Sequence, residues 1–242
     1  ATQALNAGDG VSDSLTVSSL DGTDSQVITV NITGSNDNAQ ITGIATGDVT
    51  EDVGVSAGHL TTSGSLDVAD VDEGEAVFQT PASLTGSNGY GVFTFNPANG
   101  DWTYSADNSQ SAIQGLKNGE SLTDSLTVTS LDGTASQVIT VTIHGADDTA
   151  VITGTSSGTT VEAGGVNNGT LGDNFADGTL TVADNDTGEN TFAPVSGAAL
   201  NGTYGTFTFD TVTGYWTYTL DNGRAATQAL NAGDGVSDSL TV

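Results

Sequence analysis

Acidic side chains recur in this sequence at a spacing that suits the binding of a hard cation. Asp70 and Asp72 are separated by one residue and followed by Glu75, and the same arrangement returns within 184–189. Side chains two residues apart on a strand point to the same face, so both carboxylates of such a pair can converge on one ion. Calcium (Ca²⁺) takes about six to eight oxygen ligands. The candidate ligands from this pattern are Asp70, Asp72, Glu75, Asp184, Asp186 and Glu189.

The charge balance supports a bound cation. Asp and Glu number 30 against 2 Lys and Arg, and the formal net charge is −28. Clustered carboxylates need a positive partner, and Lys117 and Arg224 are the only basic side chains. The same balance argues against nucleic acid or an anionic membrane as a partner, because phosphate contacts need clustered basic residues. A merely soluble or halophilic acidic surface is the alternative interpretation.

Other site chemistry finds little support in the composition. The sequence has no Cys, and His59 and His144 are its only imidazoles, so neither a zinc site nor a Cys–His pair is expected. Paired carboxylates can hydrolyse glycosides, but nothing here marks one acid as held protonated. We therefore expect no catalytic residues and no enzyme. No apolar run is long enough to span a bilayer, and no membrane insertion is expected.

Internal repeats organise the chain that must position these acids. The segment at 1–17 recurs without a change at 226–242, and a weaker copy lies at 111–128. Residues 90–108 match 204–222, and residues 14–34 match 125–145. Three successive copies of one unit are therefore sampled. The expected division is 1–38 for the end of a first repeat, 39–149 for a complete second repeat and 150–242 for the front of a third.

The patterning inside one unit predicts an all-β fold. An alternating segment, an Asn99-Gly100 turn and a second alternating segment form a hairpin over 92–105. Two more strands flank the turn at Asp21-Gly22, and further strands are expected near Ile41, Val53 and 66–68. About seven short strands in about 110 residues suit a Greek-key, immunoglobulin-like sandwich, with such domains joined end to end. The repeating Trp102, Tyr104, Trp216 and Tyr218 are expected in the core rather than on a sugar-stacking platform.

Two interpretations fit the incomplete first and third repeats. The chain can be a window on a longer repetitive fibre, or neighbouring copies can complete each other by donating strands. Because the segment at 1–17 is identical to that at 226–242, we favour the window.

The repeated strings resemble the VCBS repeat family of giant secreted bacterial adhesins. YGVFTFNPANGDWTYSADN at 90–108, its match at 204–222, and SLTVTSLDGTASQVITVTIHG at 125–145 carry the resemblance, which covers essentially the whole chain. It implies cadherin-like or immunoglobulin-like domains in long arrays, at the bacterial cell surface, and in many members export by type I secretion.

The junctions between repeats resemble the calcium-binding linkers of cadherins. GSNDNAQITG occupies 34–43, and GADDTAVITG at 145–154 has Thr149 where a third polar ligand is expected. An acid follows each junction at Glu51 and Glu162. Junction residues alone cannot fill the ligand shell of calcium, so we expect each site to combine them with the later acids. One predicted site consists of Asn36, Asp37, Glu51, Asp70 and Asp72, and the other of Asp147, Asp148, Glu162, Asp184 and Asp186. An isolated Asp-Gly such as Asp132-Gly133 is interpreted instead as a turn.

The function expected from these features is that of a structural or adhesive extender, stiffened by calcium at its junctions, in a fibre, adhesin or biofilm matrix. Its expected partners are calcium, neighbouring repeats of the same protein and, in the strand-exchanging alternative, other copies of the chain. The other alternative is a module that binds sugar or protein directly. Its loop would be the divergent insertion at 165–177, where Phe175 is the single aromatic residue.

Overall fold

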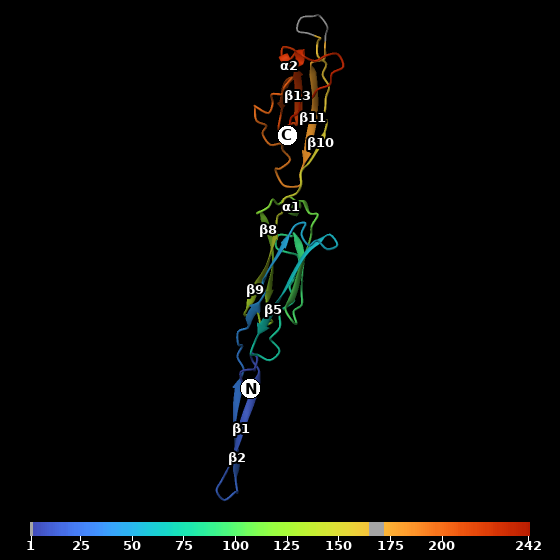
Figure 1. Cartoon of the computed structure of the whole chain (residues 1–242). Helices are drawn as coiled ribbons and strands as arrows, with labels where there is room; N and C mark the ends of the chain where they lie inside the picture. The colour runs from blue at the N-terminus through green and yellow to red at the C-terminus, as the bar shows by residue number, and fades with distance from the viewer. Residues whose placement is uncertain (1, 165–171) are drawn as a thin grey trace. The chain divides into compact units, whose positions relative to one another are not determined.

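The computed structural model describes residues 2–164 and 172–242, most of which lie in strands, turns and loops (Figure 1). The chain divides into two compact units, Ala1–Ala146 and Asp147–Val242. The described helices are single turns, α1 at Ser111–Gln114 and α2 at Ala225–Gln228. None of the described helices is long and apolar enough to cross a membrane. The expected all-β class is confirmed.

The first unit contains the complete repeat as two sheets. One has the strand order β3-β5-β7-β6 and the other the order β4-β9-β8. The pairs are antiparallel except for β4, which runs parallel to β9. The expected number of about seven strands is confirmed, and their bounds are β3 Gln40–Gly43, β4 Thr46–Thr50, β5 His59–Ala69, β6 Gly91–Phe95, β7 Asp101–Asp107, β8 Ser121–Thr129 and β9 Ser136–His144.

The core of the complete repeat lies between these two sheets. Alternate residues of β7, including Trp102 and Tyr104, are buried, as are Ile139, Val141 and Ile143 of β9. Both strands follow the period of two that places one face of a strand on a core. The expectation that Trp102 and Tyr104 pack in the core is confirmed.

The β6–β7 hairpin depends on a glycine at its turn. Gly100 has a φ of 69°, and a Cβ added there would lie 1.8 Å from the carbonyl oxygen of Leu66. A side chain is therefore excluded by strain and by space. The predicted Asn99-Gly100 turn is confirmed.

The expected strand near Val53 is wrong in position. β4 ends at Thr50, and Asp52 and Gly54 follow with φ values of 58° and 67°. These left-handed conformations turn the chain, and Val53 is 63% exposed. The apolar Val53 belongs to a turn because β4 is an edge strand whose pairing with β9 stops before it.

A separate hairpin precedes the complete repeat in the same unit. Its strands are β1 at Gly10–Ser18 and β2 at Ser25–Thr33, which pair along their whole length. Asp21 and Gly22 lie in the turn between them, as the sequence predicted, and Asp21 accepts hydrogen bonds from Ser19 and Thr23. The side chains of both strands are exposed or half-buried.

The second unit, within its described residues, has one four-stranded sheet. The strand order is β10-β11-β13-β12, and every pair is antiparallel. Leu180, Trp216 and Tyr218 lead its core cluster, so the expected core positions of these two aromatic residues are also confirmed. The strand bounds are β10 Val151–Gly154, β11 Phe175–Ala183, β12 Gly205–Phe209 and β13 Tyr215–Leu220.

Candidate metal centre

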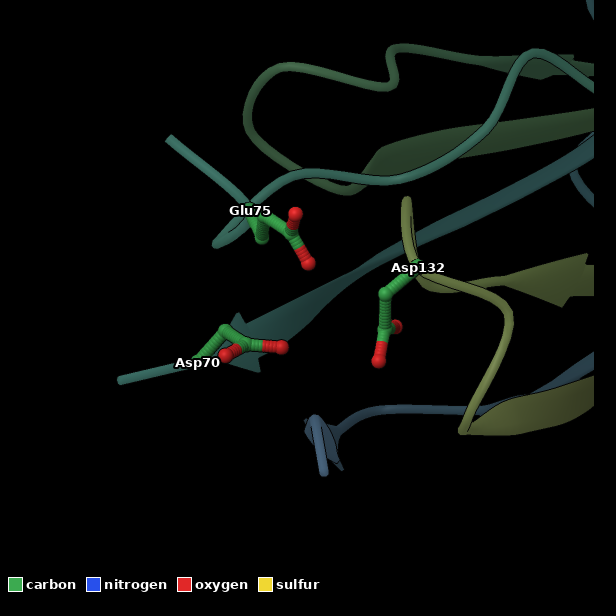
Figure 2. A group of neighbouring side chains, drawn as sticks. All are labelled: Asp70, Glu75 and Asp132. Atoms are coloured by element: carbon green, nitrogen blue, oxygen red, sulfur yellow. The ribbon is translucent and has the colours of Figure 1, made fainter. Parts of the chain in front are cut away.

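Three carboxylates of the first unit converge at one end of the complete repeat, and we call Asp70, Glu75 and Asp132 the junction cluster. Each offers an oxygen that lies within 4.8 Å of those of the other two. Figure 2 shows the three side chains pointing toward one common space. Asp70 follows the end of β5, whereas Asp132 lies in the connection between β8 and β9. The sandwich therefore brings together residues that are distant in sequence.

The linker between the hairpin and the complete repeat lies beside this cluster. The Asp37 backbone N–H donates a hydrogen bond to Asp72 Oδ2 at 2.8 Å, and Asn36 Nδ2 donates to Asp132 Oδ2 at 3.1 Å. Asp72, which is 3% exposed, also donates its backbone N–H to Asp70 Oδ1 at 2.9 Å. Asn36, Asp37, Asp70 and Asp72 thus meet as the sequence predicted.

Several buried oxygens around the junction cluster have no hydrogen-bond donor. They are Asp70 Oδ2, Asp72 Oδ1 and Glu75 Oε2, and Asn6 Oδ1 is in the same state. A buried carboxylate oxygen without a partner is costly, because it has lost water and gained nothing in exchange. A cation coordinated by these oxygens would remove that cost.

The raised pKa of Glu75 also indicates that the junction cluster needs a cation. Desolvation raises the pKa of its carboxyl group above the ordinary value, and the negative charges of Asp72, Asp70 and Asp132 raise that pKa further. The described ion pair of Arg224 is with Asp221 and not with an acid of this cluster. The like charges are therefore left to repel one another unless a cation is bound.

Asp132 is a turn residue and a member of the cluster at once. Desolvation raises the pKa of its carboxyl group, but hydrogen bonds from Ser130, Thr134 and Asn36 outweigh this and hold the pKa well below its usual range. The predicted turn at Asp132-Gly133 is right, and its role in the cluster was missed. Asp21 forms the same local turn in the β1–β2 hairpin, so local sequence alone does not reveal which Asp joins a cluster.

Asn6 was also missed by the sequence reasoning. Its Nδ2 donates a hydrogen bond to the carbonyl oxygen of Glu73 at 3.2 Å, and the Glu73 backbone N–H donates to the carbonyl of Ala4 at 3.3 Å. Asn6 precedes β1 and belongs to the first copy of the repeat. The sequence offered no reason to assign Asn6 to a cation site, because no acidic pattern of that kind surrounds it.

The second unit repeats the acidic arrangement. Oxygens of Asp184, Asp186 and Glu189 lie within 4.8 Å of one another, and Asp186 is fully buried with its Oδ1 lacking a hydrogen-bond partner. The Asp148 backbone N–H donates to Asp186 Oδ2 at 2.8 Å. This contact has the geometry of that between Asp37 and Asp72. Asp147, the preceding residue, is exposed.

The expected grouping of Glu51 with Asp70 and Asp72 is wrong. Glu51 is buried and accepts a hydrogen bond from the Ala146 backbone N–H at 2.8 Å, beyond the last residue of β9. Asp132 precedes the first residue of that strand, and a nine-residue strand spans about 30 Å. Because β4 runs parallel to β9, it carries Glu51 to the opposite end of the sandwich.

Glu162 is likewise separate from the acids with which it was grouped. Its Oε1 accepts a hydrogen bond from Gln228 Nε2 at 3.2 Å, and it is not one of the residues clustered around Asp186. The Trp and Tyr residues proposed as an alternative sugar platform are buried. The insertion at 165–177, which is the candidate loop of the ligand-binding alternative, falls partly on residues 165–171, which lie outside the described residues, and Phe175 is part of β11.

The matched family accounts for the complete repeat and the linker before it. Residues 36–145 match the bacterial cadherin-like domain. This cadherin-like match supports a bacterial repeat family of that kind, and the narrower VCBS assignment stays a prediction. The division of the chain at 38 and 149 also stays a prediction. No curated protein sequence matches the chain.

The solved structures to which the chain is similar include extracellular cadherin domains. Protocadherin gamma B7 extracellular cadherin domains 1–4 are 16% identical, with a TM-score of 0.39, over 91% of this chain and 50% of that one. Mouse clustered PcdhgC3 EC1-3 is 17% identical, with a TM-score of 0.37, over 88% of this chain and 67% of that one. The chain spans only part of each of these structures.

Proposed function

We propose that the chain is an adhesive or spacer module of a secreted bacterial repeat protein, in which calcium fixes each cadherin-like repeat to the segment before it. The observation that carries this proposal is the junction cluster, where buried oxygens lacking hydrogen-bond donors come from separate segments. An extracellular location, type I secretion and a place in a biofilm matrix or fibre are parts of the same proposal.

Calcium is the cation that these oxygens suit best. Two oxygens on opposite sides of a calcium ion are about 5 Å apart, since each calcium–oxygen distance is about 2.4 Å. The 4.8 Å limit within the junction cluster fits that span. Magnesium demands a tighter octahedron and keeps more water, and zinc prefers nitrogen or sulfur ligands. The proposed ligand set of this junction is Asn6, Asn36, Asp37, Asp70, Asp72, Glu75 and Asp132.

The proposed second site lies in the other unit. Asp184, Asp186 and Glu189 supply clustered carboxylates, and the segment with Asp147 and Asp148 reaches them through the contact between Asp148 and Asp186. Glu51 and Glu162 stay proposed ligands, but each belongs to a different group from the paired Asp residues of its own repeat.

The proposed mechanism couples ion binding to stiffness. Asn6 belongs to the segment before the hairpin, Asp37 to the linker, and Glu75 and Asp132 to the sandwich. With calcium these segments share one centre, and without it the carboxylates repel one another. Binding to the native arrangement alone also stabilises the fold by mass action. A spacer is favoured over direct sugar binding because the repeated aromatic residues are core residues.

The test compares the full chain with its variants E75Q and E73Q. Glu75 is in the junction cluster, whereas the exposed Glu73 contacts its surroundings through its backbone. Isothermal titration should show calcium binding that E75Q weakens tenfold or more in one class of sites and E73Q leaves within about threefold. Magnesium should not compete at equal concentration.

Thermal melts and small-angle scattering in calcium and in chelator give the second readout. Calcium should raise the melting temperature and lengthen and stiffen the particle. The proposal fails if calcium changes neither quantity, or if E75Q and E73Q bind calcium equally well.

A further inference from the structure

A five-residue turn with the sequence SLDGT occurs twice in the first unit. One copy, at 19–23, lies between β1 and β2, and the other, at 130–134, lies between β8 and β9. In both copies the Ser hydroxyl donates to the Asp carboxylate at 2.6 Å, and the Thr backbone N–H donates to the same oxygen at 3.2 Å. The two turns are therefore the same local structure in different surroundings.

The turn at 130–134 contacts the linker that precedes the complete repeat. The Ala39 backbone N–H donates a hydrogen bond to the Thr134 hydroxyl at 2.9 Å. Ala39 is 7% exposed and immediately precedes β3. The Thr23 hydroxyl of the other turn instead donates to Asp21 of its own turn at 2.9 Å. Thr134 thus fixes the point at which the linker enters the sandwich.

Three hydrogen bonds hold the linker on the sandwich. Those that Asn36 and Asp37 donate end on Asp132 and Asp72, which are acids of the proposed calcium site. The bond from the Ala39 backbone ends on a neutral hydroxyl outside the proposed ligand set. A cation draws on the same carboxylate oxygens as the first two bonds. The hydroxyl can keep its bond with the ion or without it.

Thr134 also acts on the acid of its own turn. Its backbone N–H donates to Asp132 Oδ1, and Asn36 Nδ2 donates to Oδ2 of the same carboxylate. On the other side of the turn, the fully buried Ser130 bonds Asp132 and pairs with Phe78. Ser130 therefore anchors the turn in the sandwich. From this anchored turn, Thr134 holds both the linker and a carboxylate of the junction cluster (Figure 2).

We propose that Thr134 is a positioning residue of the calcium site, which holds the linker and Asp132 in their binding arrangement before the ion arrives. This inference rests on the proposed function and deepens it. Calcium ligands lie about 2.3 to 2.6 Å from the ion, so ligands from two segments must be placed closely. Losing a group that orients metal ligands typically weakens metal affinity about 10- to 100-fold.

The first test compares calcium affinities of the full chain and three variants. T134V removes the hydroxyl and nearly keeps the shape of the side chain, whereas T134S keeps the hydroxyl. By isothermal titration, T134V should weaken calcium binding about tenfold or more in one class of sites, and T134S should stay within about threefold of the parent chain. T23V is the matched control, because it makes the same change in the same turn sequence away from the linker. It should leave the affinity unchanged.

The second measurement separates positioning from plain stabilisation. A residue that only stabilises the fold lowers the urea midpoint by the same amount in calcium and in chelator. A residue that raises calcium affinity also sets how far calcium raises the midpoint, because the ion binds the folded chain. At one calcium concentration, the rise should therefore be smaller in T134V than in the parent chain. In T23V it should equal that of the parent chain.

The third measurement examines the linker in the absence of the ion. In chelator, hydrogen exchange at the Ala39 amide should be slow in the parent chain and in T134S, and fast in T134V. Fast exchange in the parent chain would show that the linker is not held before calcium arrives, and would overturn the inference.

The variant E75Q distinguishes failure of this inference from failure of the proposed function. If E75Q weakens calcium binding and T134V does not, the calcium site stands and Thr134 does not position it. Equal effects of T134V and T23V on affinity, or an equal calcium-induced rise in the midpoints of T134V and the parent chain, would also overturn the inference. If the parent chain binds no calcium, both proposals fail.

Discussion

The Tyr104 hydroxyl donates a hydrogen bond to Asp124 Oδ2 at 3.0 Å inside the core of the complete repeat. Asp124 also accepts backbone hydrogen bonds from Asn88 and Gly91, so its buried carboxylate is held by three donors. Tyr218 and Asp238 form the same contact in the second unit. In the complete repeat this pair ties a loop to the two strands β7 and β8, and its loss has measurable consequences.

Removing the Tyr104 hydroxyl should destabilise the complete repeat. Y104F leaves the buried Asp124 carboxylate short of one donor, and we expect a loss of about 1–2 kcal/mol in the free energy of unfolding. Urea denaturation of the full chain measures it. Y215F is the control, because Tyr215 bonds Asp177 at the exposed surface and its loss should cost almost nothing. Equal effects of the two variants would contradict the prediction.

Alkaline pH should unfold the chain through the same tyrosine. Burial raises the pKa of Tyr104 well above its ordinary value of 10, and the Asp124 charge raises it further. The unfolded chain therefore loses this proton first, so the stability is complete below about pH 10 and falls as pH rises above it. Urea midpoints from about pH 8 to about pH 11 should fall less steeply in Y104F than in the parent chain. If the urea midpoints of Y104F and of the parent chain fall equally with pH, ionisation of Tyr104 is not the cause of the alkaline loss of stability.

The fold was largely predictable because its signals are local. Alternation marked the strands, and Asn99-Gly100 and Asp21-Gly22 marked their turns. The strand near Val53 was misplaced because left-handed Asp52 ends the strand there, and nothing in the sequence announces that conformation.

The candidate site was only partly predictable, since it depends on sheet topology. Asp70 and Asp72 are neighbours in sequence, so their pairing was visible. Glu51 was misassigned because the parallel course of β4 beside β9 decides which end of the sandwich it reaches. Asp132 and Asn6 join from distant segments, and only the folded chain brings them to the acids.

The two glycines Gly100 and Gly54 should respond very differently to the same substitution. Gly100 and Gly54 have positive φ values of 69° and 67°. An alanine in this left-handed conformation should lower the free energy of unfolding by about 1–2 kcal/mol at either position. A Cβ at Gly100 would also collide with the Leu66 carbonyl, whereas at Gly54 nothing lies within 4 Å. We expect G100A to lose more than about 4 kcal/mol in the free energy of unfolding, and G54A to lose only the ~1–2 kcal/mol due to its backbone conformation. Comparable losses of stability for G100A and G54A, measured by urea denaturation, would contradict the predicted clash at Gly100.

Glu75 should change the sign of its contribution to stability when calcium is added. Desolvation and neighbouring acids raise the pKa of Glu75 in the folded chain. Without calcium, Glu75 therefore stabilises the folded chain at pH values below its pKa in the unfolded chain. This stabilisation is lost as pH rises through the raised pKa of the folded chain. In calcium-free buffer, E75Q should therefore become more stable than the parent chain as pH rises from about 5 to about 8.

Calcium needs the ionised carboxylate, so in saturating calcium E75Q should be the less stable of the two near neutral pH. Urea midpoints of both proteins at each pH, with E73Q as the variant that should show no reversal, provide the measurement. If E75Q is no more stable than the parent chain without calcium, repulsion within the junction cluster is not what the cation relieves.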